Sequence, residues 1–281
     1  EVMQADLEPV DRAVQAAVLS QYRRKIAEKH KLRLKPVLLF KSKTIKESQA
    51  NYGAFLNKIK KLVVRDIQSI AGRASDTALE KVFEYLKKEK ISIDNFIQEL
   101  REDFSHEKCM LLDSENVDEH KQLKLNALES GDNEIRAIFA VNMLNEGWDV
   151  LNLFDIVRLY DTRDGAWVRG KYKPGKTTMG EAQLIGRGAR YFPFQLEEAD
   201  DKYKRKFDED ATNEMRIIET LFYHSARNPN YIEEIKSALT EMGILPEKHI
   251  QKELFIKDSF KKTEFWKEGV VFINDRVKNS R

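Results

Sequence analysis

The chain has 281 residues, of which 41% are hydrophobic and 34% charged, which excludes a disordered chain and predicts a charge-rich globular protein with a sizeable core. The formal net charge is only +2, so any nucleic-acid binding must use local patches or backbone amides. The single cysteine, Cys109, excludes an internal disulfide, fits a reducing compartment and is expected to pack in the core.

No apolar run is long enough to predict a membrane span, and no signal-peptide pattern is present, so we expect a cytoplasmic protein that has no membrane partner. The first residue is Glu1 and not Met, from which we expect the chain to be a piece of a longer protein.

The predicted elements alternate between helices and short apolar strands. Residues 11–29 have apolar side chains at helical spacing, and we interpret their basic end as a solvated helix end rather than a nucleic-acid contact. Residues 36–40 predict a buried parallel strand, which a polar turn joins to a helix at 47–62. Further helices are expected at 76–88, 94–104, 118–130, 213–224 and 231–242, and further strands at 109–113, 135–141, 154–160 and 269–274.

This order predicts an α/β fold, with a mostly parallel sheet and helices on both faces. We place the main domain at 36–196, with a helical insertion at about 66–106. An N-terminal helix and linker precede it at 1–35, a helical extension follows at 197–250, and a further segment, expected to be β, begins at 251–281.

The most informative stretch is Glu181-Ala-Gln-Leu-Ile-Gly-Arg-Gly-Ala-Arg-Tyr191, which sets Gln183, Arg187 and Arg190 at i, i+4 and i+7, on one face of a helix. Thr178 and Glu181 have capping-box spacing. Two guanidiniums on one face suit the spread charge of a transferring phosphoryl group. The alternative is a solvated basic helix end. It leaves unexplained two glycines that each weaken a helix by roughly 1 kcal/mol, and these predict a close approach to the backbone.

Gln-x-x-Gly-Arg-x-x-Arg resembles motif VI of superfamily 2 helicases, and Asn145-Glu-Gly-Trp-Asp-Val150 resembles their motif V, in the right order. The full sequence of these motifs, which continues through Tyr-Phe-Pro-Phe194 and into 201–208, resembles the Res subunit of type III restriction endonucleases, and the resemblance covers most of residues 30–240. The resemblance implies a second RecA-like domain of an ATP-dependent DNA translocase from the cytoplasm of a prokaryote, with restriction endonuclease activity in the full-length protein.

The resemblance also implies site residues. Arg187 and Arg190 would be arginine fingers on the γ-phosphate of ATP, and Gln183 would sense the nucleotide. Gly147 and Gly186 would lie at the nucleotide, and Asp149 would contact its ribose or couple to the nucleic-acid side. ATP and Mg²⁺ would be bound mainly by a first RecA-like domain of the same polypeptide, which this chain lacks.

Double-stranded DNA and the methyltransferase (Mod) subunit are the other implied partners, and sequence specificity is expected in the latter. The turn at Lys41, Ser42 and Lys43 matches the motif IV region, which lies near the nucleic-acid backbone. Asn142 and Asn145 of motif V are the other expected DNA contacts, because Val141 stands where the superfamily often has Thr or Ser.

Two patterns are interpreted as coincidental. Residues 170–177 match the phosphate-loop pattern Gly-x4-Gly-Lys-Thr, but hardly any apolar strand precedes them and Pro174 lacks an amide hydrogen. Residues 119–121 have the acid-x-Lys form of a nuclease site, but no Pro-Asp is present. No Cys and His cluster predicts a metal site. The alternatives are a superfamily 2 helicase without a nuclease and, for the chain by itself, a non-catalytic nucleic-acid or protein docking module.

Overall fold

The computed structural model describes residues 2–74, 77–112, 118–141, 150–162, 165–168, 171–188, 194–198, 201–210, 212–245 and 257–269. Residues 1–245 form one compact unit. In the second unit, residues 246–281, the described part contains the short helices α9 (Asp258–Lys261) and α10 (Glu264–Glu268). The strand predicted at 269–274 lies almost wholly outside the described residues.

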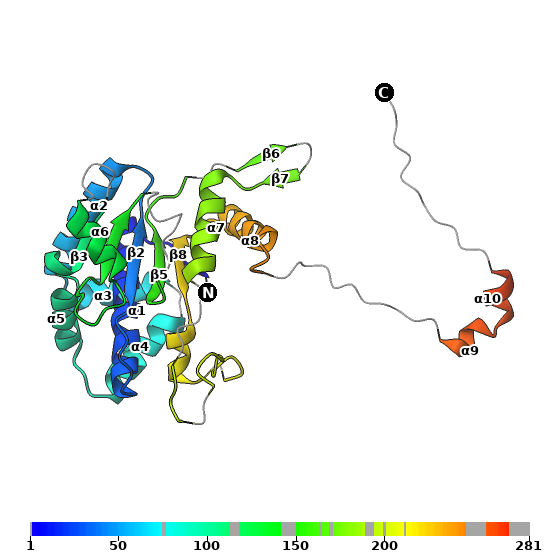
Figure 1. Cartoon of the computed structure of the whole chain (residues 1–281), viewed down its shortest axis with the longest axis horizontal. Helices are drawn as coiled ribbons and strands as arrows, with labels where there is room; N and C mark the ends of the chain where they lie inside the picture. Colours follow the sequence, from blue (N-terminus) through cyan, green and yellow to red (C-terminus); the bar gives the residue numbers. More distant parts are fainter. Residues whose placement is uncertain are drawn as a thin grey trace. The chain divides into compact units, whose positions relative to one another are not determined.

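The first unit is built on a six-stranded sheet in the order β1-β8-β5-β2-β4-β3, and every neighbouring pair is parallel (Figure 1). This confirms the predicted α/β fold of RecA-like type. The strands are β1 (Val2–Ala5), β2 (Val37–Lys41), β3 (Cys109–Leu111), β4 (Ala137–Ala140), β5 (Leu153–Arg158) and β8 (Phe222–Ala226).

Helices cover both faces of the sheet, because the central strands are apolar on both sides. In β2, Leu38 and Phe40 belong to one buried cluster, whereas Val37 and Leu39 belong to the other. The helices that contribute residues to the first cluster are α1 (Pro9–Lys29), α2 (Ile45–Lys60), α3 (Val64–Ala74), α4 (Thr77–Lys88) and α5 (Ile93–Asp103). Those that contribute residues to the second cluster are α6 (Glu119–Asn126), α7 (Lys176–Gly188) and α8 (Pro229–Glu241).

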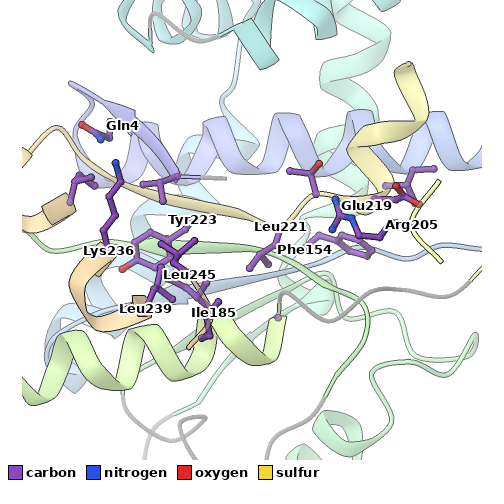
Figure 2. Close-up of a pocket in the computed structure, with 16 residues that line it drawn as sticks. Gln4, Phe154, Ile185, Arg205, Glu219, Leu221, Tyr223, Lys236, Leu239 and Leu245 are labelled. Carbon is purple, nitrogen blue, oxygen red and sulfur yellow. The ribbon is translucent and has the colours of Figure 1, made fainter. Parts of the chain in front are cut away.

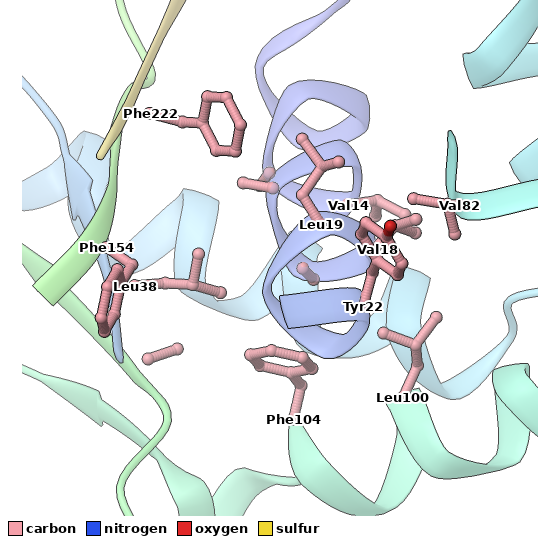
Figure 3. Packing of buried hydrophobic residues seen from close by; sticks show 14 of the residues in the cluster. Val14, Val18, Leu19, Tyr22, Leu38, Val82, Leu100, Phe104, Phe154 and Phe222 are labelled. Atoms are coloured by element: carbon pink, nitrogen blue, oxygen red, sulfur yellow. The ribbon is translucent and has the colours of Figure 1, made fainter. Parts of the chain in front are cut away.

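Helix α1 lies at the centre of the first layer, and its buried side chains point both to the sheet and to the outer helices (Figure 3). Leu19 belongs to the same buried cluster as Leu38 and Phe154 of the sheet, and so does Tyr22, whose ring packs edge-on against Tyr85 of α4. The prediction that its basic end is solvated was wrong at Arg23, which is fully buried in an ion pair with Asp155 of β5. Arg24, Lys25 and Lys29 also form ion pairs.

Several elements were missed or misassigned. The helix predicted at 213–224 is a 3-10 helix, Glu214–Glu219, followed by strand β8. In β8, Tyr223 and His224 pair with both β1 and β5, so tertiary pairing decides the conformation of this run. Strand β1 and helix α3 were not predicted, and the segment that was expected to be β contains the helices α9 and α10 instead. The domain boundaries stay a prediction, although β1 and β8 extend the main sheet beyond 36–196 at both ends.

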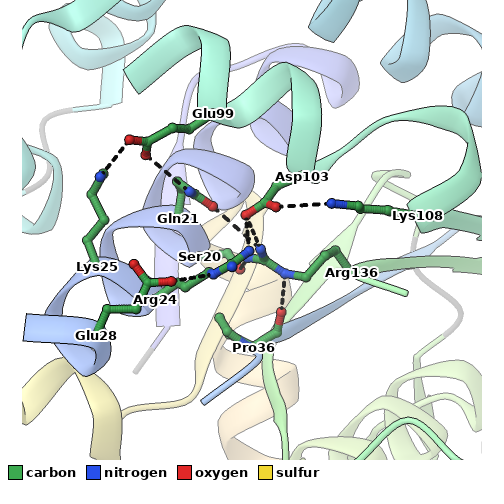
Figure 4. Close-up of polar contacts among 10 residues, drawn as sticks. All are labelled: Ser20, Gln21, Arg24, Lys25, Glu28, Pro36, Glu99, Asp103, Lys108 and Arg136. Carbon is green, nitrogen blue, oxygen red and sulfur yellow. Dashed lines mark hydrogen bonds and ion pairs between the residues drawn. The ribbon is translucent and has the colours of Figure 1, made fainter. Parts of the chain in front are cut away.

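A polar cluster closes the amino-terminal edge of the sheet (Figure 4). Arg136, which precedes β4 and is 1% exposed, donates to Asp103 of α5 at 2.5 Å, to the Pro36 carbonyl at 2.9 Å and to Ser20 of α1 at 3.2 Å. Arg24 also donates to Asp103, at 2.5 Å. Because Asp103 accepts from two guanidiniums, this carboxylate joins α1, α5 and the start of β4.

Candidate functional site

Three parallel strands end side by side at the carboxyl edge of the sheet, where ligands of open α/β sheets gather. Lys41, the last residue of β2, pairs in register with Ala140 of β4 and with Arg158 of β5. Two further backbone hydrogen bonds extend this alignment, from Leu159 N to the Lys41 carbonyl at 2.8 Å and from Ser42 N to the Ala140 carbonyl at 3.1 Å.

The predicted DNA contacts at this edge differ in how far their side chains are exposed to solvent. Lys41 is only 3% exposed, and burial lowers the pKa of its ammonium, an effect that the charge of Glu181 partly offsets. Ser42 is buried and accepts a hydrogen bond from Asn51 Nδ2 at 3.0 Å. Lys43 is exposed. Of these three side chains, only that of Lys43 is therefore available to a phosphate. Asn142 and Asn145 lie outside the described residues.

Helix α7 carries the residues of the motif VI pattern. Gln183 is exposed on it and Gly186 is half-buried. Arg187 lies in the last turn, but its side chain is not among those described. Arg190, Gly147 and Asp149 lie outside the described residues. The structure therefore places the helix and its outward glutamine, and the roles of the two arginines stay predictions.

The capping box predicted for α7 was wrong. The helix begins at Lys176, two residues before Thr178, so Thr178 and Glu181 both lie inside it. Both are buried, and each takes part in a polar cluster with helix α8. Helical period accounts for this position, since Glu181 lies two residues, or roughly 200°, from the exposed Gln183.

Glu181 is the centre of that polar cluster. Its Oε1 accepts from Tyr160 Oη at 2.5 Å and from Arg158 Nε at 3.2 Å, and its Oε2 accepts from Tyr231 Oη at 2.5 Å. The Arg158 guanidinium also lies 4.0 Å from the centre of the Tyr231 ring. Burial and the Glu181 charge raise the pKa of Tyr160, which keeps its hydroxyl a donor. Sequence reasoning had placed Glu181 in a cap and had not identified Arg158.

Side chains of the chain itself approach the two glycines of α7. A Cβ at Gly186 would lie 2.6 Å from Cδ1 of Ile244. One at Gly188 would lie 3.2 Å from Leu221 and 3.3 Å from Leu153. The predicted close approach therefore exists, and within the described part of the chain it is an internal packing contact.

The phosphate-loop pattern does not form a phosphate loop. Lys171–Lys173 is strand β7, which pairs antiparallel with β6 (Ala166–Val168) in a separate hairpin and not in the parallel sheet. The amide of Gly175 donates to Glu234 Oε1 of α8 at 3.0 Å, and Thr178 Oγ1 donates to the same oxygen at 2.8 Å. A carboxylate of the chain thus takes the position at the start of α7 that an anion would need. These residues do not fit ATP by themselves.

Near α7 lies a cavity of about 490 Å³, which Figure 2 shows between Ile185 of α7, Leu239 of α8 and Tyr223 of β8. Its floor is apolar, whereas Arg205, Glu219 and Lys236 lie among its lining residues. Neither Lys43 nor Gln183 lines it, so the cavity does not belong to the predicted site.

Other predicted features can be placed as well. Cys109 is buried, as expected, and burial raises the pKa of its thiol to about 12. Glu119 and His120 of the acid-x-Lys pattern are exposed in the first turn of α6. Among the described residues, no group of three or more His, Cys, Asp or Glu could hold a metal ion, and no helix there is long and apolar enough to span a membrane.

Comparison with known proteins confirms the resemblance that the motifs indicate. The chain is 35% identical over 175 residues to a probable type III restriction-modification enzyme HindVIP Res subunit of Haemophilus influenzae, a match that covers 55% of this chain and 34% of that protein. It is 41% identical over 106 residues to an uncharacterized protein of the same organism, covering 36% and 23%. The family model HI_1054_N, described as an N-terminal region, matches residues 177–248. The chain thus spans about a third and about a quarter of these relatives.

Proposed function

We propose that this chain is the second motor domain of an ATP-dependent DNA translocase of the type III Res kind. The observation that carries the proposal is the convergence at one sheet edge. Strand β2 ends there in the motif IV region, β4 ends just before the motif V sequence, and β5 ends in Arg158, which bonds to the helix of the motif VI pattern. In an open α/β sheet, this edge is where ligands bind.

On the nucleotide side, ATP and Mg²⁺ would be held mainly by a first RecA-like domain, because the start of α7 is occupied by Glu234. Bound ATP would supply the phosphoryl group that is transferred to water. Arg187 and Arg190 would stabilise the charge that develops on it, Gln183 would contact the nucleotide from the same helix face, and Gly147, Asp149 and Gly186 would lie nearby.

On the DNA side, Lys43 is the exposed cation of the motif IV turn, and Asn142 and Asn145 stay proposed contacts of motif V. Contacts of this kind grip phosphates without reading sequence. Specificity would then come from a methyltransferase (Mod) partner, and closure of the two motor domains would move the protein along duplex DNA.

The arginine substitutions test this function in the protein that carries both motor domains. Arg187→Ala or Arg190→Ala should each lower ATP turnover by at least roughly 10², because each removes a group that stabilises transition-state charge. Lys176→Ala is the matched control and should leave turnover close to wild type, since its pattern forms no phosphate loop. Near-normal turnover in both arginine variants, with unchanged melting curves, would refute the assignment.

A further inference from the structure

The buried carboxylate of Glu181 joins elements to which different tasks are assigned above. It lies on the inward face of α7, whose outward face carries Gln183. Through Arg158 and Tyr160 it is bonded to the end of β5 and the residues that follow, and through Tyr231 to α8. A displacement of α7 therefore acts directly on the carboxyl edge of the sheet.

Arg158 extends this link toward the proposed DNA side. It is the register partner of Lys41, and the next residue, Leu159, donates its amide to the Lys41 carbonyl at 2.8 Å. Lys41 pairs in turn with Ala140, which stands two residues before the predicted motif V contact Asn142. Lys43 lies two residues beyond Lys41. The path from the nucleotide-facing helix to the motif IV turn and to the start of motif V thus runs through Glu181, Arg158 and Lys41.

The charges along this path depend on one another. Arg158 and Lys41 are buried cations, at 2% and 3% exposure, and Glu181 is a fully buried anion. Burial lowers the pKa of Arg158, but the charge of Glu181 together with the neighbouring tyrosines outweighs this effect, and the pKa is raised. A buried ion pair of this kind adds little net stability compared with an apolar replacement, yet removing one partner is costly. Its clearest effect is to hold the helix and the strand ends in one arrangement.

We propose that Glu181 is a positioning residue that couples the nucleotide-facing helix α7 to the DNA-facing ends of β2 and β4. The inference rests on the proposed function and deepens it. When α7 shifts on nucleotide binding, Glu181 transmits the shift to Arg158 and hence to the turn after Lys41. With a neutral amide at position 181, the helix can shift without the strand ends.

The test measures coupling and does not depend on hydrolysis. In the full-length protein, the Kd for a labelled DNA duplex is measured with and without Mg²⁺ and a non-hydrolysable ATP analogue. The wild-type Kd should change roughly 5- to 150-fold with nucleotide, the usual range of coupling between two sites. In Glu181→Gln the change should fall below about twofold. Linkage requires that DNA alter the Kd of the analogue by the same factor.

Two further variants separate coupling from general loosening. Tyr160→Phe removes one hydrogen bond from the same carboxylate but leaves the ion pair, so it should keep the nucleotide effect. Arg158→Lys keeps the charge but loses the Nε donor, and it should weaken the effect as Glu181→Gln does. It also serves as the decisive variant if Glu181→Gln does not fold, as judged by its melting curve.

Each outcome decides between the two proposals. A folded Glu181→Gln with a wild-type nucleotide effect would overturn the coupling role and leave the motor function standing. Equal loss of the effect in Tyr160→Phe would also overturn it, because any weakening of the cluster would then suffice. A wild-type protein that neither hydrolyses ATP nor changes its DNA affinity with nucleotide would overturn both.

Discussion

At the scale of single residues, the buried carboxylate of Asp103 joins helices α1 and α5 to the start of strand β4. Asp103 accepts from Arg136 and Arg24 and lies 3.5 Å from the Lys108 ammonium. Burial by itself raises the pKa of the Asp103 carboxyl, but Arg136 and Arg24 outweigh this effect, and the pKa is lowered. Asp103 is therefore charged in the folded protein at any pH near neutrality.

Asp103→Asn should destabilise the fold by about 3 kcal/mol at pH 7, because it leaves the buried Arg136 without its anion. The lowered pKa of Asp103 means that its stabilising effect is present above its unfolded pKa of about 3.9 and is lost as the pH falls through its folded pKa. The free-energy difference between variant and wild type should thus shrink below about pH 4.

Urea unfolding at several pH values measures this difference. Glu102→Gln is the control, since Glu102 is an exposed neighbour on α5 that accepts a hydrogen bond from Gln98 of the same helix at 3.0 Å. It should change stability by less than about 0.5 kcal/mol. A pH-independent difference for Asp103→Asn would show that its charge does not support the cluster.

Residue roles were predictable where a side chain points to solvent, and less so where it is buried. The outward position of Gln183 follows from helical spacing. The inward pairing of Arg158 with Glu181 does not, because the two residues are distant in sequence and meet only when β5 lies beside α7. Lys41 was expected at the DNA because its place at the carboxyl end of a strand could be predicted from the sequence. The burial of its side chain could not be predicted in this way.

At the scale of elements, α7 is shaped by packing as well as by its predicted chemistry. Gly188 faces Leu221, Leu153 and Ile156 in the core, whereas Gly186 faces the tip of Ile244, which is 37% exposed. The first contact cannot relax without moving the core, but the second can relax by rotation of one side chain.

Gly188→Val should therefore destabilise the chain by about 1–3 kcal/mol, because its methyl groups overpack the core under α7. Gly186→Ala should stay within about 1 kcal/mol of wild type, since the gain in helix propensity offsets the rotation of Ile244. Urea unfolding of the two variants side by side measures both. Equal destabilisation would mean that the glycines serve a common backbone requirement.

Element types followed from the sequence wherever apolar runs were isolated by polar turns. Strands β2, β4 and β5 were predicted to within two residues at every end, because they are buried on both faces. β8 was taken for a helix, since periodicity alone does not separate a short apolar run in a strand from one in a helix. Its strand conformation is decided by β1 and β5, which were not assigned as its neighbours.

At the scale of the whole molecule, the chain should bind ATP poorly by itself. The amide of Gly175 and the hydroxyl of Thr178 already bond to Glu234, so the start of α7 repels an added phosphate. The purified 281-residue chain is expected to show no steady ATP hydrolysis in a coupled phosphate-release assay. A clear rate that Lys176→Ala abolishes would contradict this and restore the phosphate-loop interpretation.

With a net charge of +2 and one exposed lysine in the motif IV turn, the chain should bind duplex DNA weakly, with an affinity that falls steeply with salt and is indifferent to sequence. Lys43→Ala should reduce the slope of log K against log salt by about one, the effect of losing one phosphate contact. Lys41→Ala should leave the slope unchanged and lower the melting temperature instead, because the Lys41 side chain is buried.

Lys60→Ala is the matched control, since it removes the same charge at the opposite end of α2, roughly 20 Å along the helix from the turn at a rise of 1.5 Å per residue. Titration of two labelled duplexes of unrelated sequence at several salt concentrations gives the slopes. If Lys60→Ala and Lys43→Ala lower the slope equally, the effect is one of net charge and the motif IV turn does not face DNA. If binding is tight, selective between the two duplexes and resistant to salt, this domain reads sequence, and specificity does not reside in a separate methyltransferase alone.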